Sequence, residues 1–172
     1  VGSYHAGAHI IHLDGSYGGT GAAPEIAKKN IAMPIELAIP KVHNFLMKEG
    51  VREKVTVIAS GGVRTASDIA KSICLGADGC VLGTADLVAI GCTRCSNCEG
   101  GPSGRGCPWG ITTTDIELTE WVQVDWAVER LDNLYKAIQW DLRDILRKLG
   151  LSDIAELRGR TDLLRYIPKE VN

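Results

Sequence analysis

Four of the six cysteines fall within residues 92–107, close enough in sequence to hold one metal site. Cys92, Cys95 and Cys98 follow a C-x2-C-x2-C pattern and Cys107 precedes a proline, as in cysteine runs that bind iron–sulfur clusters. Eight residues separate the third cysteine from the fourth, whereas such runs have about three. Four thiolates can also hold zinc, usually from two separated C-x2-C pairs. The spacing favours iron–sulfur over zinc and leaves both open.

Two glycine turns could bind a phosphate group. The stretches SGGVRTAS, from residue 60, and GCVLGT, from residue 79, each follow or contain a short apolar segment and lead into a predicted helix. Glycine leaves backbone N–H groups accessible to phosphate oxygens, and Arg64 can add a positive charge. A tight turn at Gly61 and Gly62 without a ligand is the alternative. Because the second turn repeats the pattern, we predict a phosphate site, which would suit a flavin mononucleotide, a sugar phosphate or a nucleotide.

A third glycine-rich stretch, DGSYGGTGAAP, runs over residues 14–24. Its glycines at 18, 19 and 21 allow the backbone to approach a flat ligand, and Thr20 offers a hydroxyl group. Asp14 could orient a ligand or cap the loop through an Asx turn. A surface loop without a ligand is equally compatible with this composition.

These stretches must be positioned by strands and helices that alternate along the chain. Apolar or β-branched segments at 9–13, 55–59 and 80–82 predict strands, and helical spacing predicts helices from 34 to 50 and from 65 to 76. Strand, glycine turn and helix in repetition are typical of parallel βαβ units. The glycine turns are therefore expected at one edge of the sheet, where the strands end.

The region after the cysteines has a helical pattern. Thr114 and Glu117 have the spacing of a capping box, and apolar residues from Val124 to Leu149 recur every three or four positions up to Gly150. This pattern predicts one long amphipathic helix.

Length and composition limit the function further. The 172 residues, 45% of them apolar, are enough for one globular domain. A net charge of −2 argues against a nucleic-acid partner, and no apolar run reaches the roughly 20 residues of a membrane span. We expect a cytoplasmic protein with reduced thiols. Three strands cannot close a (β/α)8 barrel, which takes about 250 residues, so we expect a fragment or processed chain whose sheet is completed by other segments.

Taken together, the motifs resemble the FMN-binding domain of glutamate synthase, in the form common in archaea. The resemblance implies that this chain is the carboxyl-terminal half of a (β/α)8 TIM barrel, an α/β fold contributing about three parallel strands with helices, plus an iron–sulfur loop and a long C-terminal helix. The half-barrel would span 1–91, the iron–sulfur loop 92–111 and the helical segment 112–172. The implied cofactor-binding residues are Asp14, Gly18, Gly19, Thr20, Gly21, Gly61, Gly62, Val63, Arg64, Gly83 and Thr84.

The resemblance also implies the cluster and the reaction. The family's three cluster cysteines match Cys92, Cys98 and Cys107, which would hold a 3Fe-4S cluster; Cys95 is additional and could convert the site to 4Fe-4S. Electrons from ferredoxin or an NAD(P)H-oxidising subunit would pass through the cluster to FMN and reduce 2-iminoglutarate, formed from 2-oxoglutarate and ammonia, to glutamate. An amidotransferase subunit and the remainder of the FMN barrel are the expected partners, and the catalytic residues would lie in that remainder.

Three alternative functions stay open, one of them a barrel enzyme stabilised by zinc, which would explain the phosphate turns without a redox cofactor. The same domain serves N-methylglutamate synthesis, in which methylamine replaces ammonia. A non-catalytic iron–sulfur electron-transfer subunit would also explain the cysteines, although it would not need two phosphate turns.

Overall fold

The computed structural model describes residues 2–19, 21, 23–100 and 103–167. Its three described strands form one parallel sheet in the order β1-β2-β3. They are β1 (Ile10–Asp14), β2 (Thr56–Ser60) and β3 (Gly79–Cys80). Asp14 lies opposite Ser60 at the ends of β1 and β2, so the loops that follow these strands start side by side. The predicted parallel α/β sheet is confirmed, although the third strand is shorter than the pattern suggested.

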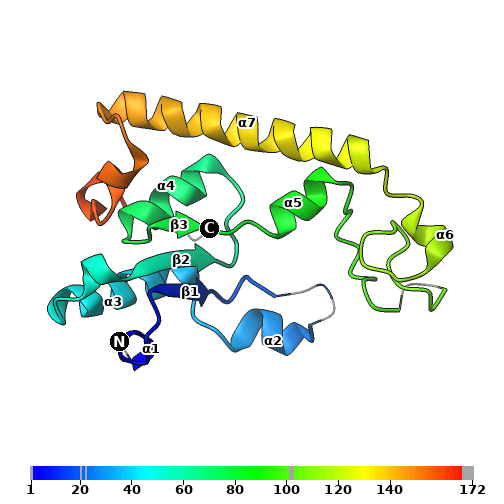
Figure 1. The fold of residues 1–172 in the computed structure, drawn as a ribbon, viewed down its shortest axis with the longest axis horizontal. Helices are drawn as coiled ribbons and strands as arrows, with labels where there is room; N and C mark the ends of the chain where they lie inside the picture. Colours follow the sequence, from blue (N-terminus) through cyan, green and yellow to red (C-terminus); the bar gives the residue numbers. More distant parts are fainter. Residues whose placement is uncertain (1, 20, 22, 101–102, 168–172) are drawn as a thin grey trace.

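Helices and short 3-10 turns connect and cover the strands (Figure 1). They are α1 (Gly2–His5), α2 (Glu25–Asn30), α3 (Ile35–Lys48), η1 (Arg52–Lys54), α4 (Ala66–Cys74), α5 (Thr84–Ala89), α6 (Ile116–Thr119), α7 (Val124–Leu149), η2 (Ile154–Leu157) and η3 (Thr161–Leu163). In the described part of the chain, no helix is both long and apolar enough to cross a membrane.

The helices form layers on either side of the small sheet. Helix α3 contacts β1 and β2, α4 contacts β3, and α7 runs along the outside of α4 and α5 (Figure 1). Ile73 of α4 packs with Leu146 of α7 and Leu157 of η2 in one buried cluster. Since Leu157 is fully buried, its side chain alone contributes about 1.5–3 kcal/mol of hydrophobic stabilisation.

Capping residues were predicted at the starts of two helices, and the structure contains one of the two predicted capping boxes. The capping box of α4 is present: Thr65 Oγ1 accepts from the Asp68 N–H at 3.2 Å, and Asp68 Oδ2 accepts from the Thr65 N–H at 3.1 Å. The box predicted at Thr114 and Glu117 is wrong. Asp115 caps α6 instead, accepting from the Leu118 N–H at 3.1 Å, because aspartate is as good a cap as threonine and is held by Arg105 at 2.7 Å.

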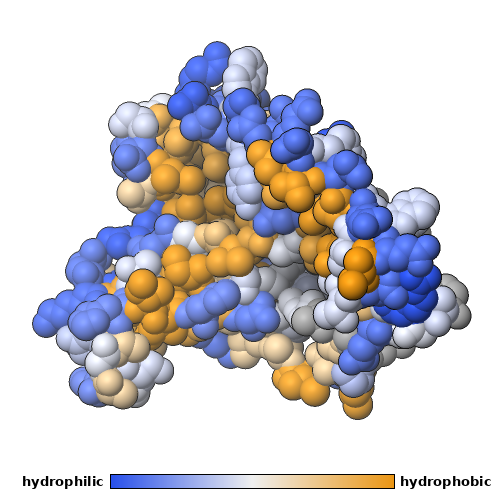
Figure 2. All heavy atoms as spheres, turned by 45° about the vertical axis from the view of Figure 1, so that its right-hand side comes forward, coloured by the Kyte–Doolittle hydropathy of each residue, from blue (hydrophilic) through white to orange (hydrophobic). Residues whose placement is uncertain are grey.

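Strand β1 has the composition of an interior strand but lies at an edge of the described sheet. The apolar run predicts a buried strand, yet every second residue of β1 is exposed, and Ile10 is 67% exposed. Apolar side chains also reach the surface in several places in Figure 2. Continuous apolar runs are typical of parallel strands covered on both faces. The exposure follows from the small number of neighbours that the described elements provide for β1.

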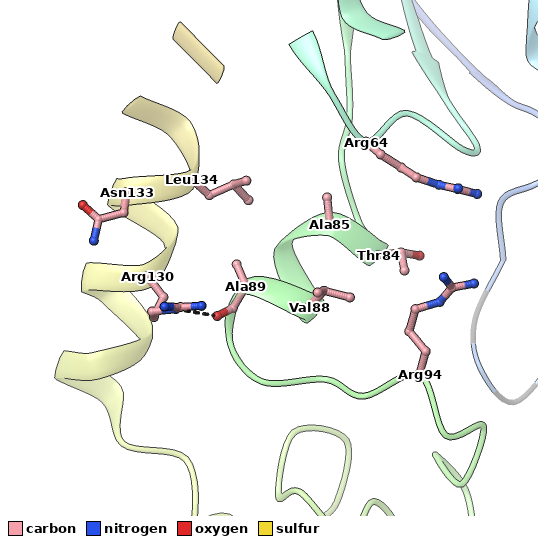
Figure 3. Close-up of a pocket in the computed structure, with 9 residues that line it drawn as sticks. All are labelled: Arg64, Thr84, Ala85, Val88, Ala89, Arg94, Arg130, Asn133 and Leu134. Atoms are coloured by element: carbon pink, nitrogen blue, oxygen red, sulfur yellow. Dashed lines mark hydrogen bonds between the residues drawn. The ribbon is translucent and has the colours of Figure 1, made fainter. Parts of the chain in front are cut away.

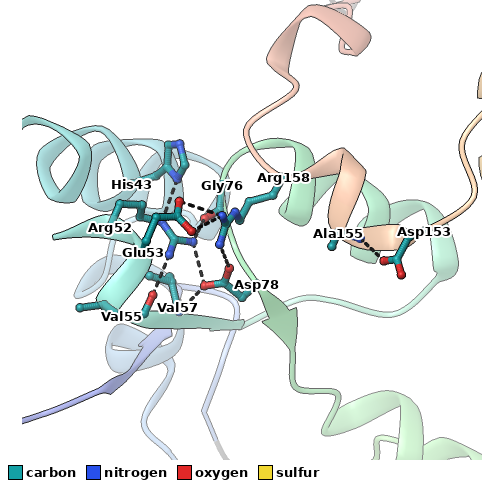
Figure 4. A network of polar contacts seen from close by, with 10 residues as sticks. All are labelled: His43, Arg52, Glu53, Val55, Val57, Gly76, Asp78, Asp153, Ala155 and Arg158. Carbon is teal, nitrogen blue, oxygen red and sulfur yellow. Dashed lines mark hydrogen bonds and ion pairs between the residues drawn. The ribbon is translucent and has the colours of Figure 1, made fainter. Parts of the chain in front are cut away.

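A buried arginine connects the elements at the end of the sheet where β2 and β3 begin (Figure 4). Arg52 is only 2% exposed, and its guanidinium donates to the carbonyls of Val55 at 2.7 Å and Gly76 at 2.9 Å. It also donates to His43 Nδ1 at 3.0 Å and to Asp78 Oδ2 at 2.8 Å. Burial, followed by the charge of Arg52, lowers the pKa of His43, in agreement with its role as an acceptor.

Asp78 balances the charge of this arginine. Its Oδ2 also accepts from the Val57 N–H at 2.7 Å, and its Oδ1 accepts from Arg158 at 2.9 Å. Burial alone would raise the pKa of Asp78, but the bonds from Val57, Arg158 and Arg52 lower it below its ordinary value of 3.8. A lowered pKa means that ionised Asp78 stabilises the fold above that ordinary value, and that this stabilisation is lost as the pH falls through the lowered value.

We expect Asp78→Asn to lower the free energy of unfolding of the intact protein by about 1–3 kcal/mol at pH 7, because Arg52 loses its buried counter-charge. The difference from wild type should shrink as the pH falls below 3.8 and through the lowered pKa, where Asp78 itself becomes protonated. Chemical denaturation over this pH range measures the effect. Asp162→Asn is the control, since that carboxylate pairs with Arg160 on the exposed surface and should matter less. Equal losses in the two variants would contradict the role given to Asp78.

Candidate functional site

One cavity of about 250 Å³ lies where the three strands end. Three loops that are distant in sequence line it, together with one side chain from the cysteine-rich segment. The lining residues are Asp14, Tyr17, Gly18, Gly19, Ser60, Gly61, Gly62, Val63, Arg64, Val81, Gly83, Thr84 and Arg94. The parallel register of the sheet brings these loops together, as βαβ connectivity predicts.

Two glycines after β2 allow the loops around the cavity to approach one another closely. Gly61 has a φ of +95°, and a Cβ atom there would lie 2.6 Å from the backbone nitrogen of Gly15. Gly62 has a φ of +97°, and its Cβ would lie 3.1 Å from Tyr17 Cβ. Both positions therefore need glycine, for the backbone angle and for the close approach of neighbouring loops. Their backbone faces the cavity without a side chain in the way.

A short chain of hydrogen bonds fixes the polar floor of the cavity. Ser60 Oγ donates to Asp14 Oδ1 at 2.6 Å, and His12 Nε2 lies 2.8 Å from the same oxygen of Ser60. Because the hydroxyl proton of Ser60 points to Asp14, His12 is the donor in the second contact. Asp14 also lies against Gly18, where any Cβ atom would meet its carboxylate. Asp14 is thus held in place by β2 and by its own loop.

Two arginines bring positive charge to this cavity. Arg64 comes from the turn before α4, and Arg94 comes from the segment between the first two cysteines. Their side chains extend into the same space beside Thr84 (Figure 3). Among the described residues, neither guanidinium forms an ion pair. Two guanidinium groups that line one cavity together with glycine turns suit a phosphate.

The cavity continues into a second hollow of about 590 Å³ between α5 and α7. The two spaces share Arg64, Thr84 and Arg94 as lining residues. Arg130 of α7 closes the far side, donating to the Ala89 carbonyl at 3.4 Å (Figure 3). The site therefore extends from the loops to the outer helix α7, which forms its far wall.

The cysteine-rich segment lies next to this cavity. Cys92 Sγ accepts from the Arg94 N–H at 3.4 Å, and Cys98 lies against Gly21, where a Cβ atom would strike its sulfur. The glycine-rich loop after β1 and the cysteine segment are thus in contact. Gly21 touches the cysteine segment and does not line the cavity, and Thr20 lies outside the described residues.

Cys107 has the surroundings of a thiolate. It is 6% exposed, and burial alone would raise its pKa. The backbone N–H groups of Thr112, Trp109 and Ile111 act on its sulfur and lower the pKa overall. The Thr112 hydroxyl also donates to the Cys98 carbonyl at 3.3 Å, which holds the loops of Cys98 and Cys107 together. N–H groups directed at cysteine sulfur stabilise the deprotonated form that metals bind.

The four sulfurs are not assembled into a metal-binding group in the described part of the chain. All four cysteines carry free thiols; Cys107 is buried, Cys92 and Cys98 are partly buried, and Cys95 is exposed. The predicted convergence of the four cysteines on one point is therefore not seen. The donor set still fits a thiolate-bound metal, because backbone N–H groups are already directed at Cys92 and Cys107.

Sequence reasoning found most of this cavity and missed part of it. The structure brings together nine of the predicted cofactor-binding residues: Asp14, Gly18, Gly19, Gly61, Gly62, Val63, Arg64, Gly83 and Thr84. It adds Tyr17, Ser60, Val81 and Arg94 to the lining. Tyr17 and Ser60 lie within stretches that the sequence already marked. Arg94 carried no such signal, because the cysteines around it directed attention to a metal.

Comparison with known proteins identifies relatives over nearly the whole chain. The family model described as a conserved region in glutamate synthase matches residues 1–152. An archaeal-type glutamate synthase [NADPH] of Dehalococcoides mccartyi is 42% identical over 166 residues, covering 96% of this chain and 32% of that protein. The archaeal glutamate synthase [NADPH] of Archaeoglobus fulgidus is 40% identical over 169 residues, covering 98% of this chain and 32% of that protein. The chain thus spans about a third of the length of these relatives.

Solved structures share the fold at lower identity. A flavocytochrome b2 mutant with pyruvate bound matches with a TM-score of 0.54 at 20% identity, covering 98% of this chain and 34% of that one. The recombinant flavin-binding domain of baker's yeast flavocytochrome b2 matches with a TM-score of 0.51 at 21% identity, covering 98% of this chain and 34% of that one. The arrangement of strands and helices described above therefore recurs as about a third of a flavin-binding domain.

Proposed function

This chain belongs to the glutamate synthase family, and from that premise we propose that it supplies the carboxyl-terminal half of the FMN-binding (β/α)8 barrel of a glutamate synthase-type oxidoreductase. The observation that carries the proposal is the cavity at the strand ends. There, two glycines with positive φ meet two arginines that have no ion pair with any described residue. Loops after the last strands are where barrels of this kind bind phosphate.

In this proposal the phosphate of FMN binds at the two turns after β2 and β3. Gly61 and Gly62 line this space without side chains, and Arg64 and Thr84 would provide polar contacts. The loop of Gly18 and Gly19 would lie toward the flavin. FMN supplies the chemistry of accepting electrons and passing a hydride to a substrate. The role of this chain is to bind and orient the cofactor and to hold Asp14 and Ser60 in fixed positions beside it.

The cysteine segment would hold an iron–sulfur cluster. Cys92, Cys98 and Cys107 are the proposed ligands of a 3Fe-4S cluster, and Cys95 could serve as a fourth ligand in a 4Fe-4S cluster. Support comes from the N–H groups directed at Cys92 and Cys107 and from the contact of Cys98 with the loop of the cofactor cavity. A structural zinc ion transfers no electrons, so it would have no need to lie close to a flavin; the proximity therefore favours an iron–sulfur cluster.

The proposed reaction is the reduction of 2-iminoglutarate, formed from 2-oxoglutarate and ammonia, to glutamate. The names of the two relatives described above specify NADPH, whereas a relative at 35% identity is named as ferredoxin-dependent, so the higher identity of the former favours an NADPH-oxidising subunit as the electron source. An amidotransferase would supply ammonia. The rest of the barrel would pair with the exposed strand β1 and bring the residues that act on the substrate.

The visible absorption spectrum of the intact protein, isolated without oxygen, tests this proposal. We expect flavin bands over a broad iron–sulfur shoulder, both bleached by dithionite, and production of glutamate from 2-oxoglutarate and ammonia. Heating releases a non-covalently bound flavin, which can then be identified as FMN. A colourless protein that contains zinc would contradict the proposal.

A further inference from the structure

Arg94 lies in the cysteine segment, but its side chain faces the proposed phosphate cavity at the strand ends. It lies between Cys92 and Cys95, yet its side chain lines the cavity formed by the turns after the strands, and also the hollow between α5 and α7 that Figure 3 shows. Its φ is +57°, a conformation that is uncommon for residues other than glycine. The same turn directs its backbone N–H to Cys92 Sγ at 3.4 Å. One residue therefore faces a cysteine sulfur with its backbone and the cavity with its guanidinium.

The charges around the cavity are not balanced within the described chain. Arg64 and Arg94 both line it, and neither guanidinium has a described ion-pair partner. The carboxylate of Asp14 also lines the cavity, but it accepts its hydrogen bond from Ser60 Oγ at 2.6 Å and forms no ion pair with either arginine. Two positive groups that share one space repel each other unless an anion lies between them. A phosphate dianion is the ligand that this pair would recognise most strongly.

We propose that Arg94 is a second phosphate-binding arginine, and that it links the cysteine segment to the binding of the cofactor. The inference rests on the proposed function, in which the cavity holds the phosphate of FMN. A cluster bound through Cys92, whose Sγ accepts from the Arg94 N–H at 3.4 Å, would fix the turn that carries Arg94, and the fixed arginine would favour the phosphate. Linkage is reciprocal, so bound phosphate would favour the cysteine conformation by the same factor.

The test compares FMN with riboflavin, which lacks the phosphate. Flavin is removed from the intact protein, and rebinding is followed by fluorescence quenching in wild type, Arg94→Gln and Arg94→Lys. We expect Arg94→Gln to weaken FMN binding about 10- to 100-fold, the loss of one charge-assisted contact, and to leave riboflavin binding unchanged. Arg94→Lys keeps the positive charge but loses the paired N–H groups of the guanidinium. Its FMN affinity should therefore lie between those of wild type and Arg94→Gln. Arg143→Gln, an exposed arginine on α7, is the matched control for charge.

A second measurement tests the link itself. FMN affinity is determined before and after iron is removed by a chelator, with iron content assayed in parallel. We expect wild type to bind FMN more weakly after iron removal, and Arg94→Gln to show little or no such change. The same dependence on iron in both proteins would overturn the link through Arg94.

The outcomes separate this inference from the function on which it rests. FMN affinity equal to wild type in both Arg94 variants would overturn the role of Arg94 while the flavin site stands. Equal weakening of riboflavin and FMN would show that Arg94 acts on the fold and not on the phosphate, which also overturns it. Failure of wild type to bind FMN at all would instead overturn the proposed flavin site.

Discussion

Replacing Gly61 with alanine is expected to prevent the protein from folding stably and from retaining its flavin. The added Cβ atom would lie 2.6 Å from the nitrogen and 2.8 Å from the carbonyl oxygen of Gly15, which are backbone atoms and cannot rotate away. Relief requires separating the ends of β1 and β2, where Asp14 and Ser60 are hydrogen-bonded at 2.6 Å. Together with the strain at positive φ, we expect a loss of more than about 4 kcal/mol, a large part of the total stability of a domain.

Gly7→Ala is the matched control for this substitution. Gly7 has a φ of +96°, nearly the same as the +95° of Gly61, but no atom of the described residues lies within 4 Å of the position that an added methyl group would take. It carries only the backbone strain, which amounts to about 1–2 kcal/mol. Thermal and chemical denaturation of both variants, with flavin content measured in parallel, separates the two effects. Similar stability of the two variants would mean that the close approach of Gly61 to Gly15 is unimportant.

Cys107→Ser is expected to remove the proposed cluster and with it all glutamate formation driven by the natural electron donor. Cys107 is 6% exposed, and although burial raises its pKa, three backbone N–H groups lower it overall, which favours the deprotonation that metal binding requires. A serine hydroxyl stays protonated and is a poor ligand for iron. Iron and sulfide assays should show the loss of the cluster, whereas FMN should still bind, with the weaker affinity expected after iron loss, and be reduced directly by dithionite.

Two other cysteines supply the controls for this experiment. Cys95→Ser changes an exposed thiol that the family set does not require, and we expect the variant to keep three irons and its flavin. Cys74→Ser changes a buried cysteine of the α4 core that lies outside the cysteine segment, so it should affect stability and not iron content. Full iron content in Cys107→Ser would contradict the proposed ligand set.

Many of the residues that line the cavity could be predicted because short stretches of sequence determine where they lie. Each glycine turn follows its own strand, and parallel connectivity then places the turns at one edge regardless of the rest of the fold. Gly61, Gly83 and Asp14 were found in this way, and the structure places them around one space. The capping box of Thr65 and Asp68 is equally local and was also found.

Other features depend on contacts between distant segments, and sequence patterns do not reveal them. The capping box expected at Thr114 is absent, and Asp115 caps the helix instead because Arg105 holds it from ten positions away. The exposure of β1 was not predicted. An apolar run indicates that a strand is suited to burial on both faces, but it does not show which segments of this chain cover the strand. Arg94 reaches the cavity through a left-handed turn that no residue preference would suggest.

The contacts of Arg158 have a consequence for the order in which the protein folds. This residue, in the tail after η2, bonds to Asp78, 80 positions earlier, and to Glu53, 105 positions earlier. Closing such long loops is slow compared with forming a βαβ unit. During synthesis, β1, β2 and β3 all emerge before Arg158 exists, with Arg52 and Asp78 already in place. The ion network around Arg52 and Asp78 therefore stays incomplete until the segment that carries Arg158 has been made and has docked beside them.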